Sequence, residues 1–168
     1  MAEELTQRPI LKIKWTILDY ILEVVAIVFI IITTVYAFRS YSELPNTVAT
    51  HFDMEGNADG FGNKSSIWAM PIISFVLWML LSIVNQFPHA LNYPFKLTKD
   101  NVVRQYKMAQ RFLRIMKIWV CAIFLYALHS IVQTSNNQNY KMNIGILVLL
   151  GSMIVFMSIY LYISSKKK

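Results

Sequence analysis

Residues 15–38 have the sequence WTILDYILEVVAIVFIIITTVYAF, in which only Asp19 and Glu23 are charged. A helix rises about 1.5 Å per residue, so this stretch can cross a hydrocarbon layer of roughly 30 Å. Further apolar stretches of similar length follow at residues 67–84, 115–132 and 144–163. Lipid offers no partner for backbone N–H and C=O groups, so each stretch is expected to be helical. The sequence predicts an all-α integral membrane protein with four transmembrane helices.

The composition favours a lipid environment for most of the chain. Its 168 residues are 56% hydrophobic and 15% charged, whereas soluble domains are about half apolar and about a quarter charged. Four spans leave little room for a second core, so we expect a single membrane domain over residues 1–168. Cys121, the single cysteine, lies in an apolar stretch and has no intrachain partner for a disulfide.

The positive residues are distributed unevenly between the connecting segments, and this predicts the orientation. Thirteen of the 16 lysines and arginines lie in the N-terminal tail, between residues 96 and 117, or at the C-terminal end. Lysine and arginine are enriched on the cytoplasmic side of membrane proteins. Both termini are therefore expected in the cytoplasm, with residues 39–66 outside the cell membrane. The net charge of +7 is then mainly a topology signal, and no nucleic-acid partner is expected.

The outer segment, residues 39–66, is polar and contains signals for a folded unit. Residues 47–52, TVATHF, are rich in β-branched and aromatic side chains, as expected of a short strand. Gly56, Gly60 and Gly62 follow, and glycine suits turn conformations with positive φ. We expect a small extracytoplasmic cap between the first two helices, such as a hairpin, with the three glycines in turn conformations.

Acidic residues near His51 raise the question of a metal site. A calcium-loop pattern beginning at Glu55 fails, because Ser66 stands at the twelfth position, where a bidentate glutamate is needed. Zinc requires three or four converging ligands, whereas alternate residues of a strand face opposite sides. We expect Asp53 and Asp59 to face water, with no metal and no cofactor. Recognition of a polar ligand and metal binding are the alternatives.

The loop sequence also resembles the signature of a known bacterial membrane domain of unknown function, found at the start of the SdpI-type immunity proteins. The signature runs from Tyr41 to Lys64 as Y-S-E-L-P-x-x-V-x-x-H-F-x-x-x-G-x-x-D-G-x-G-x-K. The residues that we expect to form a recognition loop are Leu44, Pro45, His51, Phe52, Asp53, Gly56, Asp59, Gly60 and Lys64. In that family the signature follows the first membrane helix, as it does here. The resemblance implies a Gram-positive sensor or immunity-type protein whose loop responds to an extracellular peptide or envelope stress.

Glu23 is the charged residue expected deepest in the membrane, about two helical turns inside the first span. Charges at such depth are costly, and they tend to be paired or functional. We expect a structural partner at similar depth, such as Lys117 or Asn85. The alternative is proton or ion handling, which would make the chain a small transporter or transporter subunit. Asp19, closer to the boundary, is expected to reach water beside the basic residues of the N-terminal tail.

His129 is expected near the outer end of the third span, within reach of the acidic loop, as a hydrogen-bonding residue at the membrane interface. The sequence contains no Ser/His/Asp arrangement, no His-x-x-x-His spacing and no glycine-rich phosphate loop. We therefore expect no enzymatic activity.

Residues 98–114 form a basic amphipathic segment that continues into the third span. Thr98 is a plausible N-cap for this helix. Arg104, Lys107, Arg111 and Arg114 recur at helical spacing and form a basic stripe. We expect an interfacial helix held by anionic lipid, each basic residue contributing about 1 kcal/mol. The alternative is a docking face for a cytoplasmic protein.

Overall fold

A computed structural model describes residues 7–93, 96–137, 140–142 and 145–166. Its long helices are α1 (Ile17–Tyr41), α2 (Ala69–Val84), α3 (Val102–Asn136) and α4 (Gly145–Lys166). Between α1 and α2 lie β1 (Thr47–Phe52), β2 (Ala58–Asn63) and the 3₁₀ helix η1 (Lys64–Trp68); a second 3₁₀ helix, η2 (Pro88–Ala90), follows α2. Four helical segments of the described chain are long and apolar enough to cross a membrane. The chain is therefore a multi-pass membrane protein, as predicted.

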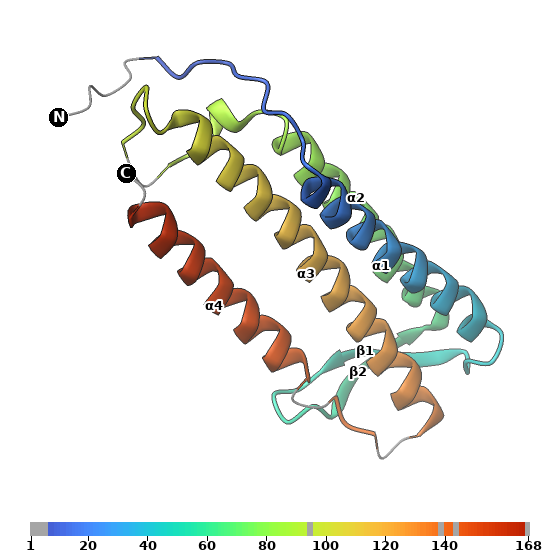
Figure 1. The fold of residues 1–168 in the computed structure, drawn as a ribbon. Helices are drawn as coiled ribbons and strands as arrows, with labels where there is room; N and C mark the ends of the chain where they lie inside the picture. Colours follow the sequence, from blue (N-terminus) through green and yellow to red (C-terminus); the bar gives the residue numbers. More distant parts are fainter. Residues whose placement is uncertain (1–6, 94–95, 138–139, 143–144, 167–168) are drawn as a thin grey trace.

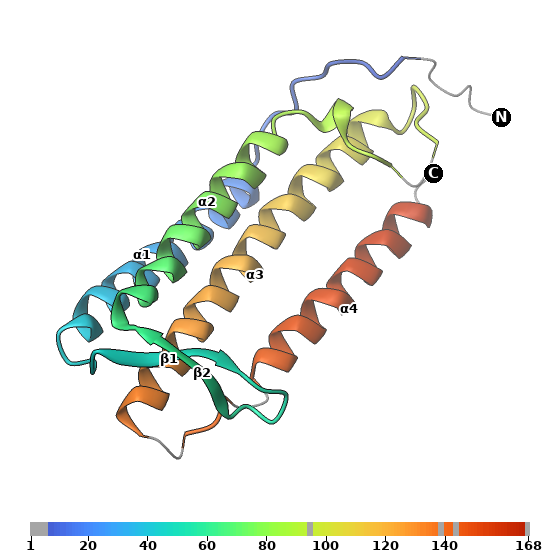
Figure 2. The ribbon, with the colours of Figure 1, turned by 180° about the vertical axis from the view of Figure 1, so that it is seen from behind.

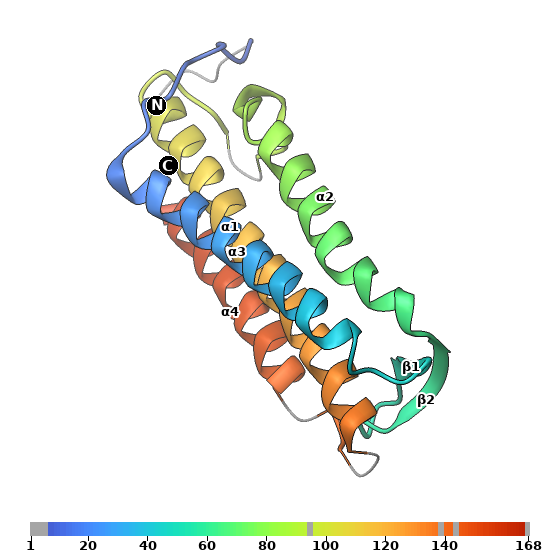
Figure 3. The ribbon, with the colours of Figure 1, turned by 90° about the vertical axis from the view of Figure 1, so that its right-hand side faces the viewer.

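The helices run side by side, and α3 is the central one (Figures 1 and 2). One side of α3 is covered by α1 and α2, and the other by α4. The hairpin of β1 and β2 lies across one end of the bundle, while the segment before α1 and the end of α4 lie at the other. Figure 3 shows that α1 and α2 are close at the hairpin end and diverge toward the opposite end.

The hairpin is attached to the helices by an apolar core. β1 pairs with β2 in antiparallel order, and the predicted strand at residues 47–52 is confirmed. Leu44, Val48 and Ile67 are buried together with side chains from α1 and α3: Ala37, Leu128, Ile131 and Val132. Removing this apolar surface from water stabilises the attachment, so the hairpin is a fixed part of the bundle end.

The glycines of the hairpin serve two different purposes. Gly56 has φ 81° and lies in the turn, where a side chain would also collide with the carbonyl oxygen of Met142. Gly60 and Gly62 lie within β2, so the prediction of turn conformations is wrong for both. A Cβ at Gly60 would lie 2.8 Å from the Cβ of His51. Gly60 therefore needs glycine because the facing strand approaches closely, whereas at Gly62 the nearest atom is Cγ2 of Thr50 at 3.0 Å, a tight contact that the threonine side chain must relieve.

The third span and the basic segment before it form one continuous helix, α3. This helix begins at Val102 and its N-cap residue is Asn101, so the prediction of Thr98 as the cap is wrong. Asn101 organises the preceding loop: its Oδ1 accepts from the Thr98 N–H at 3.0 Å, and its Nδ2 donates to the Lys96 carbonyl at 3.1 Å. The helix therefore starts from a hydrogen-bonded loop.

α4 packs against α3 through a small number of specific contacts. Phe112 stacks on Tyr160 with ring centroids 4.4 Å apart, and it also stacks on Phe156. Near the end of α4, the hydroxyl of Ser164 donates to Oε1 of Gln105 at 2.6 Å. Most apolar side chains of α4 are exposed, as expected of a helix that faces lipid on most sides.

Candidate functional site

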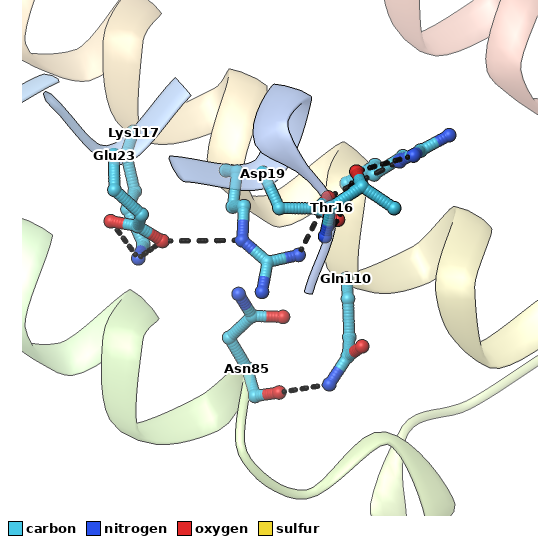
Figure 4. A network of polar contacts seen from close by, with 8 residues as sticks. Thr16, Asp19, Glu23, Asn85, Gln110 and Lys117 are labelled. Atoms are coloured by element: carbon cyan, nitrogen blue, oxygen red, sulfur yellow. Dashed lines mark hydrogen bonds and ion pairs between the residues drawn. The ribbon is translucent and has the colours of Figure 1, made fainter. Parts of the chain in front are cut away.

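A network of charged side chains joins α1 to α3 near the end of the bundle that lies opposite the hairpin. Lys117 donates to both carboxylate oxygens of Glu23, at 2.7 and 3.0 Å. Arg111 Nε lies 3.2 Å from Oδ1 of Asp19, and Arg114 Nη1 lies 3.4 Å from the same atom. Residues three or four apart share a helix face, so the carboxylates on α1 and the cations on α3 face each other. Figure 4 shows this network.

Arg114 is the central residue of this charge network. Besides Asp19, it approaches Glu23, with Nε 3.4 Å from Oε1. Its guanidinium also lies 4.4 Å from the ring centroid of Trp15, a distance typical of cation–π contacts. The side chain is only 2% exposed, and buried charges are stable in proteins only when they are paired. Arg114 therefore links the two carboxylates of α1 into one unit.

The structure confirms one of our expectations about these carboxylates and corrects the other. Glu23 pairs with Lys117, the partner expected from its depth. Asp19 is buried between α1 and α3, so the expectation that it reaches water beside the N-terminal tail is wrong. It accepts hydrogen bonds from the N–H and hydroxyl of Thr16, at 2.8 and 2.7 Å. A carboxylate in the first turn also offsets the positive end of the helix dipole.

A cavity of about 400 Å³ adjoins the charge network, between α1, α2 and α3. Its walls include Glu23 and Lys117, together with Trp78 of α2 and Asn85, the C-cap residue of that helix. Lys117 Nζ lies 5.6 Å from the ring centroid of Trp78. Nε2 of Gln110 donates to the carbonyl of Asn85 at 3.0 Å and so anchors the end of α2 to α3 (Figure 4). The sequence indicated the charged residues but not this cavity, which depends on the packing of three helices.

The second notable surface is the outward side of the hairpin. Nδ1 of His51 lies 2.5 Å from Oδ1 of Asp59 on the facing strand, and both side chains are exposed. Met54 is 98% exposed and Phe61 is 63% exposed. Neither apolar residue was among the predicted recognition residues, because Met54 lies in the turn and the strand that contains Phe61 is too short for its alternation to indicate exposure. Within the described residues, no three metal-binding side chains converge.

Several of the predicted recognition residues build the hairpin itself. Leu44 is part of the apolar core, and Phe52 packs against that core. Lys64 lies over the ring of Tyr41, with Nζ 4.9 Å from the centroid, at the base of the hairpin. The exposed residues among the predicted set include Pro45, His51 and Asp59, which leaves a smaller surface for contact with a ligand.

Asp53 organises the turn of the hairpin. Its carboxylate accepts from the backbone N–H of Asn57 at 2.7 Å and from Nδ2 of the same residue at 2.9 Å. The hydrogen bond from the Asn57 side chain lowers the pKa of the Asp53 carboxyl below its ordinary value. Beyond the turn, the N–H of Met142 donates to the carbonyl of Gly56 at 2.8 Å. The turn is thus tied to the segment between α3 and α4.

His129 lies on α3 and contacts α1. Its Nδ1 is 3.3 Å from the hydroxyl of Tyr36, so it forms a hydrogen bond between the two helices. The contact agrees with the expected role of a hydrogen-bonding residue. This hydrogen bond thus links α3 to α1.

Comparisons with known proteins find a similarity for part of the chain. Residues 28–75, from the middle of α1 to the start of α2, match the domain of unknown function DUF1648. An uncharacterized protein of Archaeoglobus fulgidus is 31% identical over 67 residues, which cover 35% of this chain and 37% of the relative. The chain therefore spans little more than a third of that relative's length. No solved structure matches the chain.

Proposed function

We propose that this multi-pass protein lies in the cell membrane with both termini in the cytoplasm, and that its hairpin recognises an extracellular peptide. The protein would act as a sensor or immunity-type protein. The observation that carries the proposal is a fixed hairpin whose core is buried while His51, Asp59 and Phe61 face outward. A fixed surface loses little conformational entropy on binding, which suits a recognition site.

The distribution of positive residues supports this orientation. The N-terminal segment and the end of α4 lie at one end of the bundle, and the hairpin lies at the other (Figure 2). In the sequence, thirteen of the 16 lysines and arginines belong to the N-terminal tail, to residues 96–117 or to the C-terminal end. Because such residues are enriched in the cytoplasm, the hairpin would face the outside.

The hairpin offers a suitable geometry for an extended peptide. Among the described residues, its sheet has two strands, so each strand has an edge without a strand partner. An extended peptide can add to such an edge through backbone hydrogen bonds, with side chains providing specificity. Phe61 and the His51–Asp59 pair would supply apolar and polar contacts. The resemblance of the loop to SdpI-type immunity proteins supports a peptide as the ligand.

Cysteine labelling on intact cells tests the orientation. Cys121 is buried and is first replaced by alanine to remove background. Glu55→Cys in the hairpin turn should then react with an impermeant thiol reagent, whereas Asp100→Cys, also exposed but before α3, should react only after permeabilisation. The opposite pattern would refute the proposed orientation.

A peptide challenge tests the recognition role. Cells that lack the gene should be more sensitive to at least one membrane-active peptide, and expression of the chain should restore survival. Asp59→Asn and Phe61→Ser should abolish this protection while the protein still accumulates in the membrane. Glu43→Gln, which removes one negative charge outside the hairpin, is the matched control and should protect normally. Equal protection by all variants would contradict the proposal.

The cavity beside Glu23 favours a second function, a small transporter or transporter subunit. Transport of protons or ions would require Glu23 to change its charge or its partner during each cycle. Glu23→Gln would then abolish activity without removing the protein from the membrane. If the hairpin recognises a peptide, the same substitution should leave protection nearly unchanged. A fully expressed but inactive Glu23→Gln, beside active hairpin variants, would favour transport.

A further inference from the structure

The cavity between α1, α2 and α3 has an excess of positive charge. The adjoining network contains two carboxylates, Asp19 and Glu23, and three cations, Arg111, Arg114 and Lys117. Lys117 is only 1% exposed and Arg114 only 2%. Arg111 is one-third exposed and can be compensated by water, but the cavity wall itself holds one carboxylate, Glu23, and two buried cations, Arg114 and Lys117. A buried charge without a compensating partner is costly, so this wall favours one additional negative charge.

Buried polar atoms at the cavity wall lack hydrogen bonds from the described part of the chain. They are Nε1 of Trp78, Nε of Arg114 and Oδ1 of Asn85. Two of these atoms are donors, and rotation of the Asn85 amide would present its NH₂ group instead. Because buried polar groups are nearly always hydrogen-bonded, a ligand rich in acceptor oxygens would complete this wall.

Glu23 also lines the cavity, but its charge is already engaged. Both of its carboxylate oxygens accept hydrogen bonds from Lys117. Arg114 is shared between Asp19 and Glu23 at 3.4 Å each, distances that are long for charge-assisted hydrogen bonds. The guanidinium is therefore the cation best able to bind a further acceptor, and its planar group of donors matches phosphate oxygens.

The location of the cavity suggests where such a ligand comes from. Ile27 of α1 and Trp15, which lies just before α1, line it and are exposed. In this part of the bundle α1 and α2 diverge (Figure 3). Gln86, just beyond the end of α2, lines it as well. The cavity is thus lined both by Ile27, which faces lipid, and by polar residues at the helix ends. Lipid headgroups lie at the level of these helix ends.

We propose that this cavity binds one phosphate group, as the phosphodiester of an anionic phospholipid or as free phosphate. Arg114 and Lys117 supply the charge, and the indole N–H of Trp78 and the Asn85 amide supply hydrogen bonds. The inference is independent of the function proposed for the hairpin, because it depends only on residues at the other end of the bundle.

Native mass spectrometry on the full chain tests the proposal. The protein is placed in nanodiscs with equal amounts of phosphatidylcholine and phosphatidylglycerol, and the lipid retained after release is identified. Retention of one phosphatidylglycerol per chain supports a lipid source. Saturable binding of inorganic phosphate in nanodiscs of phosphatidylcholine alone supports free phosphate as the source. The absence of both would overturn the proposal.

Two substitutions separate the effect of charge from damage to the fold. Lys117→Met and Glu23→Gln each break the same ion pair, but they change the net charge of the network in opposite directions. Lys117→Met should weaken binding about tenfold, which corresponds to about 1.4 kcal/mol, whereas Glu23→Gln should strengthen it. Trp78→Phe, which keeps the aromatic ring but removes the N–H, should weaken binding less than Lys117→Met. Equal weakening by both ion-pair variants would overturn the proposal.

Discussion

The two ends of the bundle join α1 to α3 by different physical means. At the hairpin end, Ala37 and Leu128 belong to an apolar core that also includes Val48 of β1. At the opposite end, Asp19 and Glu23 of α1 face arginine and lysine side chains of α3. The first contact depends on burial of apolar surface and the second on buried ion pairs.

This difference shows how the surroundings determine which interaction is useful. Next to water, removing apolar surface is the main favourable contribution. Within lipid, an apolar side chain gains little by leaving one apolar environment for another, and polar contacts between helices become more important. Ion pairs also need a specific geometry, so the charge network fixes how α1 and α3 are rotated relative to each other.

The largest expected effect is at the charge network. Arg114→Met removes the side chain shared by Asp19 and Glu23 and leaves two carboxylates with fewer partners. Breaking a buried pair typically costs about 3–5 kcal/mol, so the variant should show a clearly lower free energy of unfolding or fail to accumulate. Thermal unfolding in detergent, followed by circular dichroism, provides the measurement.

Arg39→Met is the matched control, because Arg39 is exposed in the last turn of α1. Surface substitutions of this kind usually change stability by no more than about 0.5 kcal/mol. If both variants unfold like the wild type, the charge network contributes little to stability and the contrast between the two ends fails.

An intermediate effect is expected at the turn of the hairpin. Gly56→Ala places a Cβ at positive φ and against the carbonyl of Met142. The conformational cost alone is about 1–2 kcal/mol, and the collision adds to it. Gly151→Ala in α4 is the control, because a Cβ there meets no atom within 4 Å. That change should be neutral or slightly stabilising, and a similar loss at both positions would contradict the account of the turn.

The smallest expected effect is a pH dependence of the turn. Hydrogen bonds from Asn57 stabilise the carboxylate of Asp53, so its pKa is lower in the folded chain than in the unfolded one. The resulting stabilisation is complete above the unfolded pKa and is lost as the pH falls through the folded pKa. The Asn57 amide proton, followed by NMR, should therefore shift only below the ordinary pKa of 3.8. Asp53→Asn should abolish this step, and a step at higher pH would contradict the assignment.

Features that depend only on residues close together along the chain could be predicted from the sequence. Apolar length alone located the spans, and the β-branched run TVATHF located β1 at residues 47–52. Glu23 and Lys117 were matched because both were expected at the same depth of the membrane. Depth follows from counting residues along each span, so this pair required no knowledge of helix rotation.

Features that depend on helix rotation were not predicted. Arg111 and Arg114 were assigned to a basic stripe, yet both face Asp19 in the structure. Hydropathy locates a helix along the membrane normal, but the side that a helix presents to its neighbour depends on packing. The cavity beside Trp78 requires three helices at once, and for that reason no single segment of sequence indicated it.

The charge network also affects the order in which the protein can be assembled during synthesis. Glu23 lies 94 residues before Lys117, and Asp19 lies 95 residues before Arg114. At about 5–20 residues per second, α3 is completed about 5–20 s after α1. Until then α1 carries two carboxylates without their native cations, and lipid strongly disfavours that state. α1 is therefore expected to reach its final depth only together with α3.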